Sequence, residues 1–230
     1  DVILPGMARL NVPIPLGGTS NHLRRDALET VKGWDPWNVT EDADLGLRLK
    51  YFGYETRWLP STTYEEAPFE FRIWFAQRTR WFKGWMQTAI VHVGRRHAMT
   101  KNVLLIDRIS LDLVATISFV TALYHPLPLI IATELVLNTN DIFTSAWHSP
   151  GRMNLFSSLL ICHLILNVIL TIRSTYLRTV RLRVSDFLLQ LPYSLLRSIA
   201  AWRALFELMI APSHWHKTPH GRARSFDPPL

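Results

Sequence analysis

The chain has almost no cysteine and no charged side chain over two long stretches. Cys162 is the single cysteine in 230 residues, which excludes an intramolecular disulfide framework and a zinc site built from several cysteines. Residues 113–133 and 153–172 contain no Asp, Glu, Lys or Arg. Internal repeats and low-complexity tracts are also missing. What is present is a 48% hydrophobic composition with 9 tryptophans, which argues against an intrinsically disordered chain.

Lysine and arginine outnumber aspartate and glutamate by 25 to 18, so the net charge is +7. Such an excess is typical of proteins that bind nucleic acid and of segments that flank a membrane. No basic patch with a recognisable nucleic-acid-binding fold accompanies the charge. We therefore expect membrane lipid, and not nucleic acid, as the partner that accounts for it.

The two uncharged stretches predict helices that cross a membrane, because a bilayer core of about 30 Å needs roughly 20 apolar residues. Two prolines, Pro126 and Pro128, fall within the first stretch and would kink it or turn it back. A buried core helix of a soluble protein is the alternative for both stretches. A third apolar stretch, 187–212, is broken by a proline and by charged residues. The pattern leaves open whether this stretch spans, re-enters or lies at the interface.

These patterns divide the chain into two parts. Residues 1–102 have the charge density of a soluble domain, and residues 103–230 are predicted to form a transmembrane and interfacial helical region with a basic cytoplasmic tail. The loop 173–183 has four arginines and no acid, which predicts a cytoplasmic position for it and, through two crossings, for residues 1–102. The apolar, proline-rich start without an initiator methionine predicts that an N-terminal portion is missing; an ordinary domain with an extended first segment is the alternative.

A loop of small residues follows the first apolar segment, which we expect to be a strand. It contains Gly18, Thr19, Ser20 and Asn21 and precedes a stretch with helical character. Small residues let a ligand approach the backbone closely. A plain strand-to-helix turn with a Ser or Asn cap explains the same pattern, so the loop alone indicates a site only weakly.

Three carboxylates open a predicted helix directly after Thr40. They are Glu41, Asp42 and Asp44. Acidic residues at a helix start stabilise the free amides and the helix dipole, which is the structural explanation. Three in four positions exceed what capping needs, because they repel one another. Such repulsion raises at least one carboxyl pKa and suits a general base.

A predicted amphipathic helix over residues 69–88 carries the third group. Gln77, Arg80, Trp81 and Gly84 are related by three- and four-residue steps and share one face. Arginine binds a diphosphate through paired hydrogen bonds, and tryptophan stacks on a sugar ring. An interfacial membrane anchor without chemistry is the alternative. It accounts for the phenylalanines on the opposite face but not for the polar cluster; these phenylalanines are Phe71, Phe75 and Phe82.

The motif Thr40-Glu41-Asp42, followed at 77–81 by Gln-Arg-Thr-Arg-Trp, resembles the T-E-D and Q-x-x-R-W motifs of the family-2 membrane glycosyltransferases, the cellulose-synthase-like enzymes. The spacing between the two motifs is similar to that of the family, and the ending 211–221 is similar to the tail of one bacterial branch. The resemblance implies an α/β fold, the C-terminal half of a glycosyltransferase A domain, followed by an α-helical transmembrane region. It also implies a multi-pass protein of the bacterial inner (plasma) membrane whose catalytic part is cytoplasmic.

The resemblance further implies a role for each matching residue. Asp42 would be the general base, with Glu41 supporting its position; Thr40 belongs to the same catalytic motif. Gln77 and Arg80 would hold the donor diphosphate. Trp81 would form the floor of the acceptor site. The acceptor-side loop would comprise Gly18, Thr19, Ser20 and Asn21. Near the C-terminus, a mobile gate over the donor pocket or merely an interfacial anchor would comprise Trp215, Lys217 and His220.

The implied reaction is an inverting transfer of a sugar from a nucleotide donor, expected to be a UDP-sugar, to a growing β-linked glycan. The divalent cation of the family, Mg or Mn, would be bound by residues upstream of this sequence, because Asp42-Ala43-Asp44 belongs to T-E-D-x-D and not to the donor-site metal motif. The 230-residue chain alone is therefore expected to be inactive. Two alternatives remain: a non-processive membrane glycosyltransferase acting on a lipid or short acceptor, and a non-catalytic membrane subunit of a polysaccharide export assembly.

Overall fold

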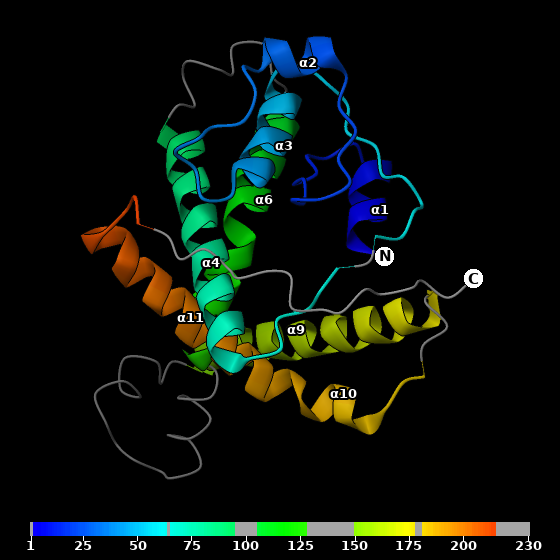
Figure 1. Ribbon diagram of the computed structural model, residues 1–230. Helices are drawn as coiled ribbons and strands as arrows, with labels where there is room; N and C mark the ends of the chain where they lie inside the picture. The colour runs from blue at the N-terminus through cyan, green and yellow to red at the C-terminus, as the bar shows by residue number, and fades with distance from the viewer. Residues whose placement is uncertain (1, 64, 95–104, 128–149, 178–180, 215–230) are drawn as a thin grey trace.

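The computed structural model describes residues 2–63, 65–94, 105–127, 150–177 and 181–214 (Figure 1). Every regular element within these ranges is a helix. In chain order the helices are α1 (Ile3–Arg9), α2 (Arg25–Thr30), α3 (Glu41–Tyr51), α4 (Phe71–Gly94), α6 (Leu105–Tyr124), α9 (Pro150–Leu177), α10 (Val184–Leu188) and α11 (Gln190–Ile210).

The largest packing unit is formed by α4, α6 and α11. Figure 1 shows α4 beside α6, with α11 against both at their lower end. One buried cluster joins the three helices, and alanines supply most of it because small side chains allow helix axes to come close. The cluster comprises Phe82, Met86, Ala122, Ala200, Ala201 and Ala204. The hydroxyl of Ser198 adds a buried hydrogen bond from α11 to the carbonyl oxygen of Ala122 on α6.

Helix α3 is buried on two sides and therefore holds a fixed position. Leu45 and Leu49 pack with α2 around Ala27 and Val31. On another side, Leu47 packs in a cluster with residues of α4 and α6 that includes Ala89, Leu111 and Ala115. Both Leu45 and Leu47 are 0% exposed.

The predicted α/β fold is wrong for the part of the chain that the structure describes, which contains no strand. Residues 12–16, before Gly17, form no regular element and pair with no neighbouring strand. Pro13 and Pro15 lack backbone N–H groups, which removes donors that a ladder would need. The segment lies instead against α3 at Gly46, where an added Cβ would meet the carbonyl oxygen of Ile14 at 2.5 Å and the amide of Leu16 at 2.9 Å.

The predicted transmembrane region is also contradicted. None of the helices in the described ranges combines the length and the apolar character that a membrane crossing requires. Helix α6 has Asp107 and Arg108 near its start and ends at Tyr124, so it covers only part of the predicted span 113–133, whose last residues lie outside the described ranges. The predicted span 153–172 lies within α9.

Helix α11 covers most of the third apolar stretch, and its charged residues have partners there. The guanidinium of Arg197 lies 5.7 Å from the ring centroid of Phe82, and that of Arg203 lies 5.4 Å from the ring centroid of Phe75. Arg203 also pairs with Glu207 one turn later, at 2.8 Å. The charges that interrupt this stretch therefore cover the aromatic side of α4.

The proposed boundary between residues 102 and 103 falls in the range 95–104, outside the described residues. On either side of it, α4 and α6 share two buried clusters. Helix α9 contacts the start of α11 through a hydrogen bond of 2.8 Å from the Gln190 amide to the Thr171 hydroxyl. The division 1–102 and 103–230 stays a prediction.

Candidate active site

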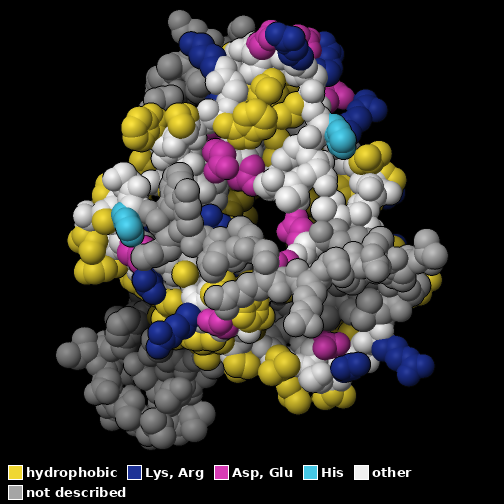
Figure 2. Space-filling view, viewed as in Figure 1, with side chains coloured by type: hydrophobic (Ala, Val, Ile, Leu, Met, Phe, Trp, Pro, Cys, Tyr) yellow, Lys and Arg dark blue, Asp and Glu magenta, His cyan; other side chains and the backbone are white. Residues whose placement is uncertain are grey.

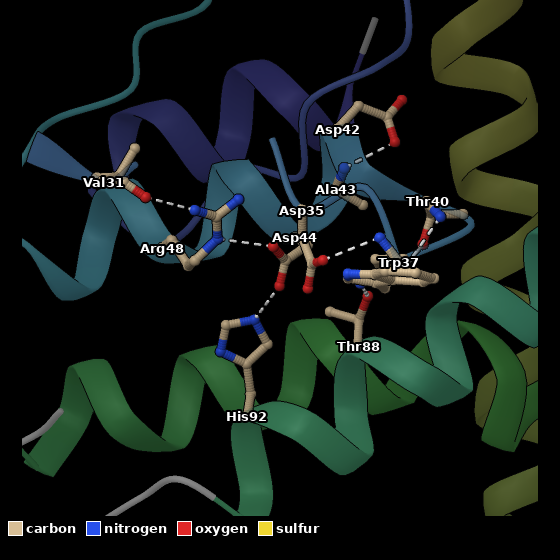
Figure 3. A network of polar contacts seen from close by, with 11 residues as sticks. Val31, Asp35, Trp37, Thr40, Asp42, Ala43, Asp44, Arg48, Thr88 and His92 are labelled. Carbon is tan, nitrogen blue, oxygen red and sulfur yellow. Dashed lines mark hydrogen bonds and ion pairs between the residues drawn. The ribbon is translucent and has the colours of Figure 1, made fainter. Parts of the chain in front are cut away.

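Asp42 lies in the first turn of α3, as the sequence predicts for the helix that starts at Glu41. Its side chain is partly exposed, and its Oδ1 accepts a hydrogen bond of 2.8 Å from the amide of Ala43. Figure 3 shows the Asp42 carboxylate pointing away from Asp44. The neighbouring Glu41 is exposed, whereas Thr40 before it is buried. Asp42 is thus held by its own helix start and is open to a ligand.

The loop of small residues lies beside this carboxylate. A Cβ built at Gly18 would be 3.4 Å from Asp42 Oδ2. Further along the loop, the Thr19 hydroxyl donates to the Glu65 carboxylate, and the hydroxyls of Ser20 and Thr63 are 2.7 Å apart. The amide of Asn21 donates to the carbonyl oxygen of Gly17. The structure therefore brings the predicted acceptor-side loop next to the predicted base and ties it to the chain before α4.

One face of α4 lies against the loop that leads into α3. At Gly84, an added Cβ would meet Thr40 Cγ2 at 2.5 Å and Thr40 Oγ1 at 2.6 Å. One turn later, the Thr88 hydroxyl accepts a buried hydrogen bond of 2.7 Å from the Asn38 amide. Gln87 Oε1 accepts from the amide of Val39 at 3.5 Å. This face of α4 fixes the T-E-D loop at successive turns.

Gln77, Arg80 and Trp81 continue that face toward the start of α4, because they precede Gly84 by seven, four and three residues. Arg80 Nε is buried without a hydrogen-bond partner among the described residues. The Trp81 ring is 39% exposed, and the guanidinium of Arg78 lies 4.3 Å from its centroid. Burial lowers the pKa of Arg78, assisted by the charge of Arg197, yet an arginine stays charged at any physiological pH. The polar groups that the sequence selects thus lie on one ridge with the contacts to Thr40.

The opposite side of α4 is apolar, as predicted, and it is covered by protein where the structure describes it. Phe82 is buried in the cluster with α6 and α11, and Phe75 packs against that cluster. Phe71, at the helix start, is 59% exposed and stacks on Trp74 and Phe75. The helix also runs to Gly94, beyond the predicted end at residue 88.

Asp44 is turned to the interior, unlike Asp42. Its side chain accepts from Arg48 Nε at 2.6 Å and lies 2.8 Å from Nε2 of His92 on α4 (Figure 3). Burial on its own would raise the pKa of Asp44, but the hydrogen bond from His92 and the charge of Arg48 outweigh it and leave the pKa below its ordinary value. Both Asp44 oxygens are therefore engaged and are not shared with Asp42.

No group of three or more His, Cys, Asp or Glu side chains within the described ranges is placed to hold a metal ion. The carboxylates of Asp42 and Asp44 point to different sides of α3 (Figure 3). This part of the chain therefore does not fit the expected Mg or Mn. The predicted gate, Trp215, Lys217 and His220, lies outside the described residues.

The chain just before the predicted gate is fixed to α4. The ammonium group of Lys83, which is 1% exposed, donates to the carbonyl oxygens of Ala211 and His214 at 2.5 Å each. Gln87 Nε2 donates to the carbonyl oxygen of Pro212 at 2.8 Å. Burial lowers the pKa of Lys83, which Glu207 partly offsets. The end of α11 therefore lies one to two turns from Arg80 and Trp81 along the helix.

Comparison with known proteins gives the family of the chain. Residues 6–211 match the family described as glycosyl transferase family group 2, which is most of the chain. The chain belongs to this family. It is also similar to a protein named probable glycosyltransferase YdaM from Bacillus subtilis (strain 168), with 38% identity over 68 residues, 29% of this chain and 16% of that protein.

A second relative, a probable glycosyltransferase from Sulfolobus acidocaldarius, is 33% identical over 82 residues, which cover 36% of this chain and 18% of the relative. The two alignments thus span less than a fifth of either relative. No solved structure matches the chain.

Several residues of this glycosyl transferase family group 2 chain lie at the site although the sequence analysis did not select them. Thr88 and His92 follow Gly84 by four and eight residues, so extending the periodicity of the polar face of α4 would have found them. Arg78, which covers Trp81, gives no such signal because it falls on a neighbouring face. Gln87, three residues after Gly84, follows from the same periodicity, whereas Asn38 became recognisable only through its contact with Thr88.

Proposed function

We propose that the protein transfers a sugar from a nucleotide-sugar donor to a glycan acceptor, with Asp42 as the general base. The observation that carries this proposal is the continuous face of α4: the groups suited to a diphosphate and a sugar ring share it with Gly84, which contacts Thr40 two residues before Asp42. Membership of glycosyl transferase family group 2 supports sugar transfer, and members of this family generally use nucleotide-sugar donors and glycan acceptors.

In the proposed reaction, Asp42 accepts the proton of the acceptor hydroxyl while that oxygen attacks the anomeric carbon. The bond to the donor diphosphate breaks in the same step, so the configuration inverts and a β-linkage results. Gln77 and the guanidinium of Arg80 bind the diphosphate and stabilise its charge as it leaves. Trp81 supports the acceptor sugar by stacking, and the loop at Gly18 allows the acceptor to come close to Asp42.

The finer assignments are part of the same proposal. We take the donor to be a UDP-sugar and the acceptor a growing glycan of the cellulose-synthase-like type. Residues outside the described part of the chain would bind the divalent cation. A non-processive enzyme that acts on a lipid or short acceptor is the second candidate, and product length separates the two.

Radiolabelled UDP-glucose, UDP-N-acetylglucosamine and GDP-mannose, supplied to membranes that contain the full-length protein, test this function. We expect transfer from one of them, and loss of about 100-fold or more with Arg80→Ala, because removal of one charge-stabilising donor has effects of that order. Arg72→Ala is the matched control, since Arg72 is exposed in the first turn of the same helix. Full activity of Arg80→Ala would contradict the role of Arg80.

We further propose that the protein works at the cytoplasmic face of a bacterial plasma membrane. Exposed apolar side chains support this: on α11, Trp202, Phe206 and Met209 are more than half exposed. Figure 2 shows hydrophobic side chains uncovered at several places on the face in view. Large apolar patches commonly mark interaction sites. In a density gradient, the full-length protein should float with phosphatidylcholine–phosphatidylglycerol vesicles, and a smaller fraction of the Trp202→Ser variant should do so. If the wild-type protein stays at the bottom while the vesicles float, the proposal is wrong.

A further inference from the structure

A buried polar network connects the far end of α4 to α3. Asp44 is 2% exposed and His92 is 5% exposed, with 2.8 Å between Asp44 Oδ1 and His92 Nε2. The imidazole stacks on the ring of Tyr51, with 5.3 Å between centroids and an interplanar angle of 7°. Arg48 completes the network by pairing with Asp44 and donating to the carbonyl oxygen of Val31 at 2.6 Å. Figure 3 shows the polar contacts of Asp44 with Arg48 and His92 between the two helices.

The members of the network on α3 share one face. Asp44, Arg48 and Tyr51 are separated by four and three residues, which is the spacing of neighbours along a helix face. His92 contacts two of them directly, Asp44 by a hydrogen bond and Tyr51 by ring stacking. Asp42 lies two residues before Asp44, in the same first turn. Any shift of Asp44 relative to α4 would move Asp42 as well, because one helical turn is rigid.

The hydrogen-bond pattern defines the form of His92. Asp44 is a carboxylate that accepts this hydrogen bond, so Nε2 of the imidazole carries a hydrogen. His92 Nδ1 is buried and has no hydrogen-bond partner among the described residues. The pair thus provides one directional contact, and a group that donates from the same position can replace it.

Two contacts on the same face of α4 fix how α3 lies against it. The first is the close approach of Gly84 to Thr40. The second, eight residues and about 12 Å further along α4, is the pair of His92 and Asp44. The apolar clusters around Leu45 and Leu47 hold α3 in place, and these two contacts add close constraints on its register at two points along α4. The position of α3 determines where Asp42 lies relative to Arg80 on α4.

We propose that His92 and Asp44 are positioning residues for sugar transfer: their buried contact holds the first turn of α3, and so the Asp42 carboxylate, in register with the diphosphate-binding residues of α4. The inference rests on the proposed function. Neither residue touches the substrate, so their loss should lower the rate of the chemical step and leave donor binding largely intact. Displacement of a reacting group by about 1 Å lowers a rate by as much as 100-fold.

The test compares full-length His92→Leu, His92→Gln and Asp44→Asn with the wild type, using the labelled UDP- and GDP-sugar panel. Rates are divided by the amount of folded protein, measured by thermal unfolding. We expect His92→Leu to lower kcat about tenfold or more with the donor KM within about twofold. His92→Gln, whose amide can donate to Asp44, should recover most of kcat. The double variant His92→Leu/Asp44→Asn should lose less kcat than the two single losses, added as free energies, would give.

Ser198→Ala is the matched control, because it removes a buried interhelical hydrogen bond between α11 and α6, away from α3. It should lower stability and leave kcat unchanged. If His92→Leu keeps its kcat per folded molecule, or if His92→Gln is no better than His92→Leu, the positioning role is wrong. If His92→Leu does not fold, Asp44→Asn and His92→Gln are compared with the wild type. A lower kcat in Asp44→Asn with most of kcat kept in His92→Gln supports the positioning role, and an unchanged kcat in Asp44→Asn contradicts it.

Asp42→Asn, measured in parallel, separates this inference from the proposed function. Transfer that survives Asp42→Asn would overturn the assignment of the base and the positioning role with it. Transfer that is lost in Asp42→Asn but unchanged in the His92 and Asp44 variants would overturn the positioning role alone.

Discussion

Gly84 is the residue at which α4 comes closest to the T-E-D loop. Any side chain there would overlap Thr40, whose Cγ2, Oγ1 and backbone amide lie 2.5, 2.6 and 2.8 Å from the position of an added Cβ. The Thr40 amide cannot move freely, because it also donates to the Asn38 side chain at 3.0 Å. Absence of a side chain at residue 84 therefore sets the distance between the ridge and the base.

Gly84→Ala should destabilise the protein by about 1–3 kcal/mol, the usual cost of overpacking, and should reduce transfer further by displacing Asp42. Gly6→Ala is a suitable control, since nothing lies within 4 Å of an added Cβ in that helix. Urea unfolding of both variants checks the prediction. A Gly84→Ala protein as stable as the wild type would show that the approach to Thr40 is looser than described.

Asp44 links the buried network to pH. Its pKa is below the ordinary value in the folded state, so between the folded and unfolded pKa values the unfolded chain binds more protons, and the free energy of unfolding rises with pH. The stabilisation is complete above the ordinary carboxyl pKa of about 4 and is lost as the pH falls through the folded pKa. Asp44→Asn should flatten this acid limb in urea unfolding between about pH 2 and 5; an unchanged limb would assign the dependence to other carboxylates.

At the scale of elements, α4 has two faces with different tasks. One face carries the polar ridge from Gln77 to His92, and the other packs on α6 and α11 through Phe82 and Met86. The ridge can hold substrate groups in fixed positions only if the packed face does not move. The alanines of α11 make this possible, because they let the helix approach α4 closely.

Ala201→Leu should therefore lower the free energy of unfolding by about 1–3 kcal/mol, as Ala201 is 0% exposed within this contact. Ile199→Leu, at a residue that is 55% exposed, should have an effect below about 0.5 kcal/mol. Thermal unfolding of the two variants measures the difference. Equal stability would mean that α11 tolerates a wider separation from α4.

At the scale of the whole molecule, the local patterns were more predictable than the architecture. The helix after Thr40 and the amphipathic helix at Gln77 follow from carboxylates at a helix start and from three- and four-residue spacing, and both are confirmed. Local periodicity also placed Gly84 on the face that meets Thr40.

The sequence-based predictions that are wrong concern the tertiary surroundings of a segment and not its local pattern. A strand was expected before Gly17, but whether an extended segment joins a sheet depends on a partner, and here it packs on α3 at Gly46. The uncharged stretches 113–133 and 153–172 were expected to span a membrane, yet the helices that contain their described residues, α6 and α9, do not combine the length and apolar character of a membrane crossing. The pair of His92 and Asp44 is a contact between residues 48 apart in sequence, and no local pattern encodes it.

The measurement that tests the account most directly is sugar transfer by the full-length protein with Asp42→Asn. Asparagine keeps the shape of the side chain and can still accept from the Ala43 amide, but it cannot take a proton from the acceptor. The account predicts that transfer falls by 100-fold or more, in the range of general-base effects of about 10²–10⁴, while binding of the labelled nucleotide sugar is retained. Transfer at the wild-type rate would contradict the assignment of Asp42 as the base and the site built around it.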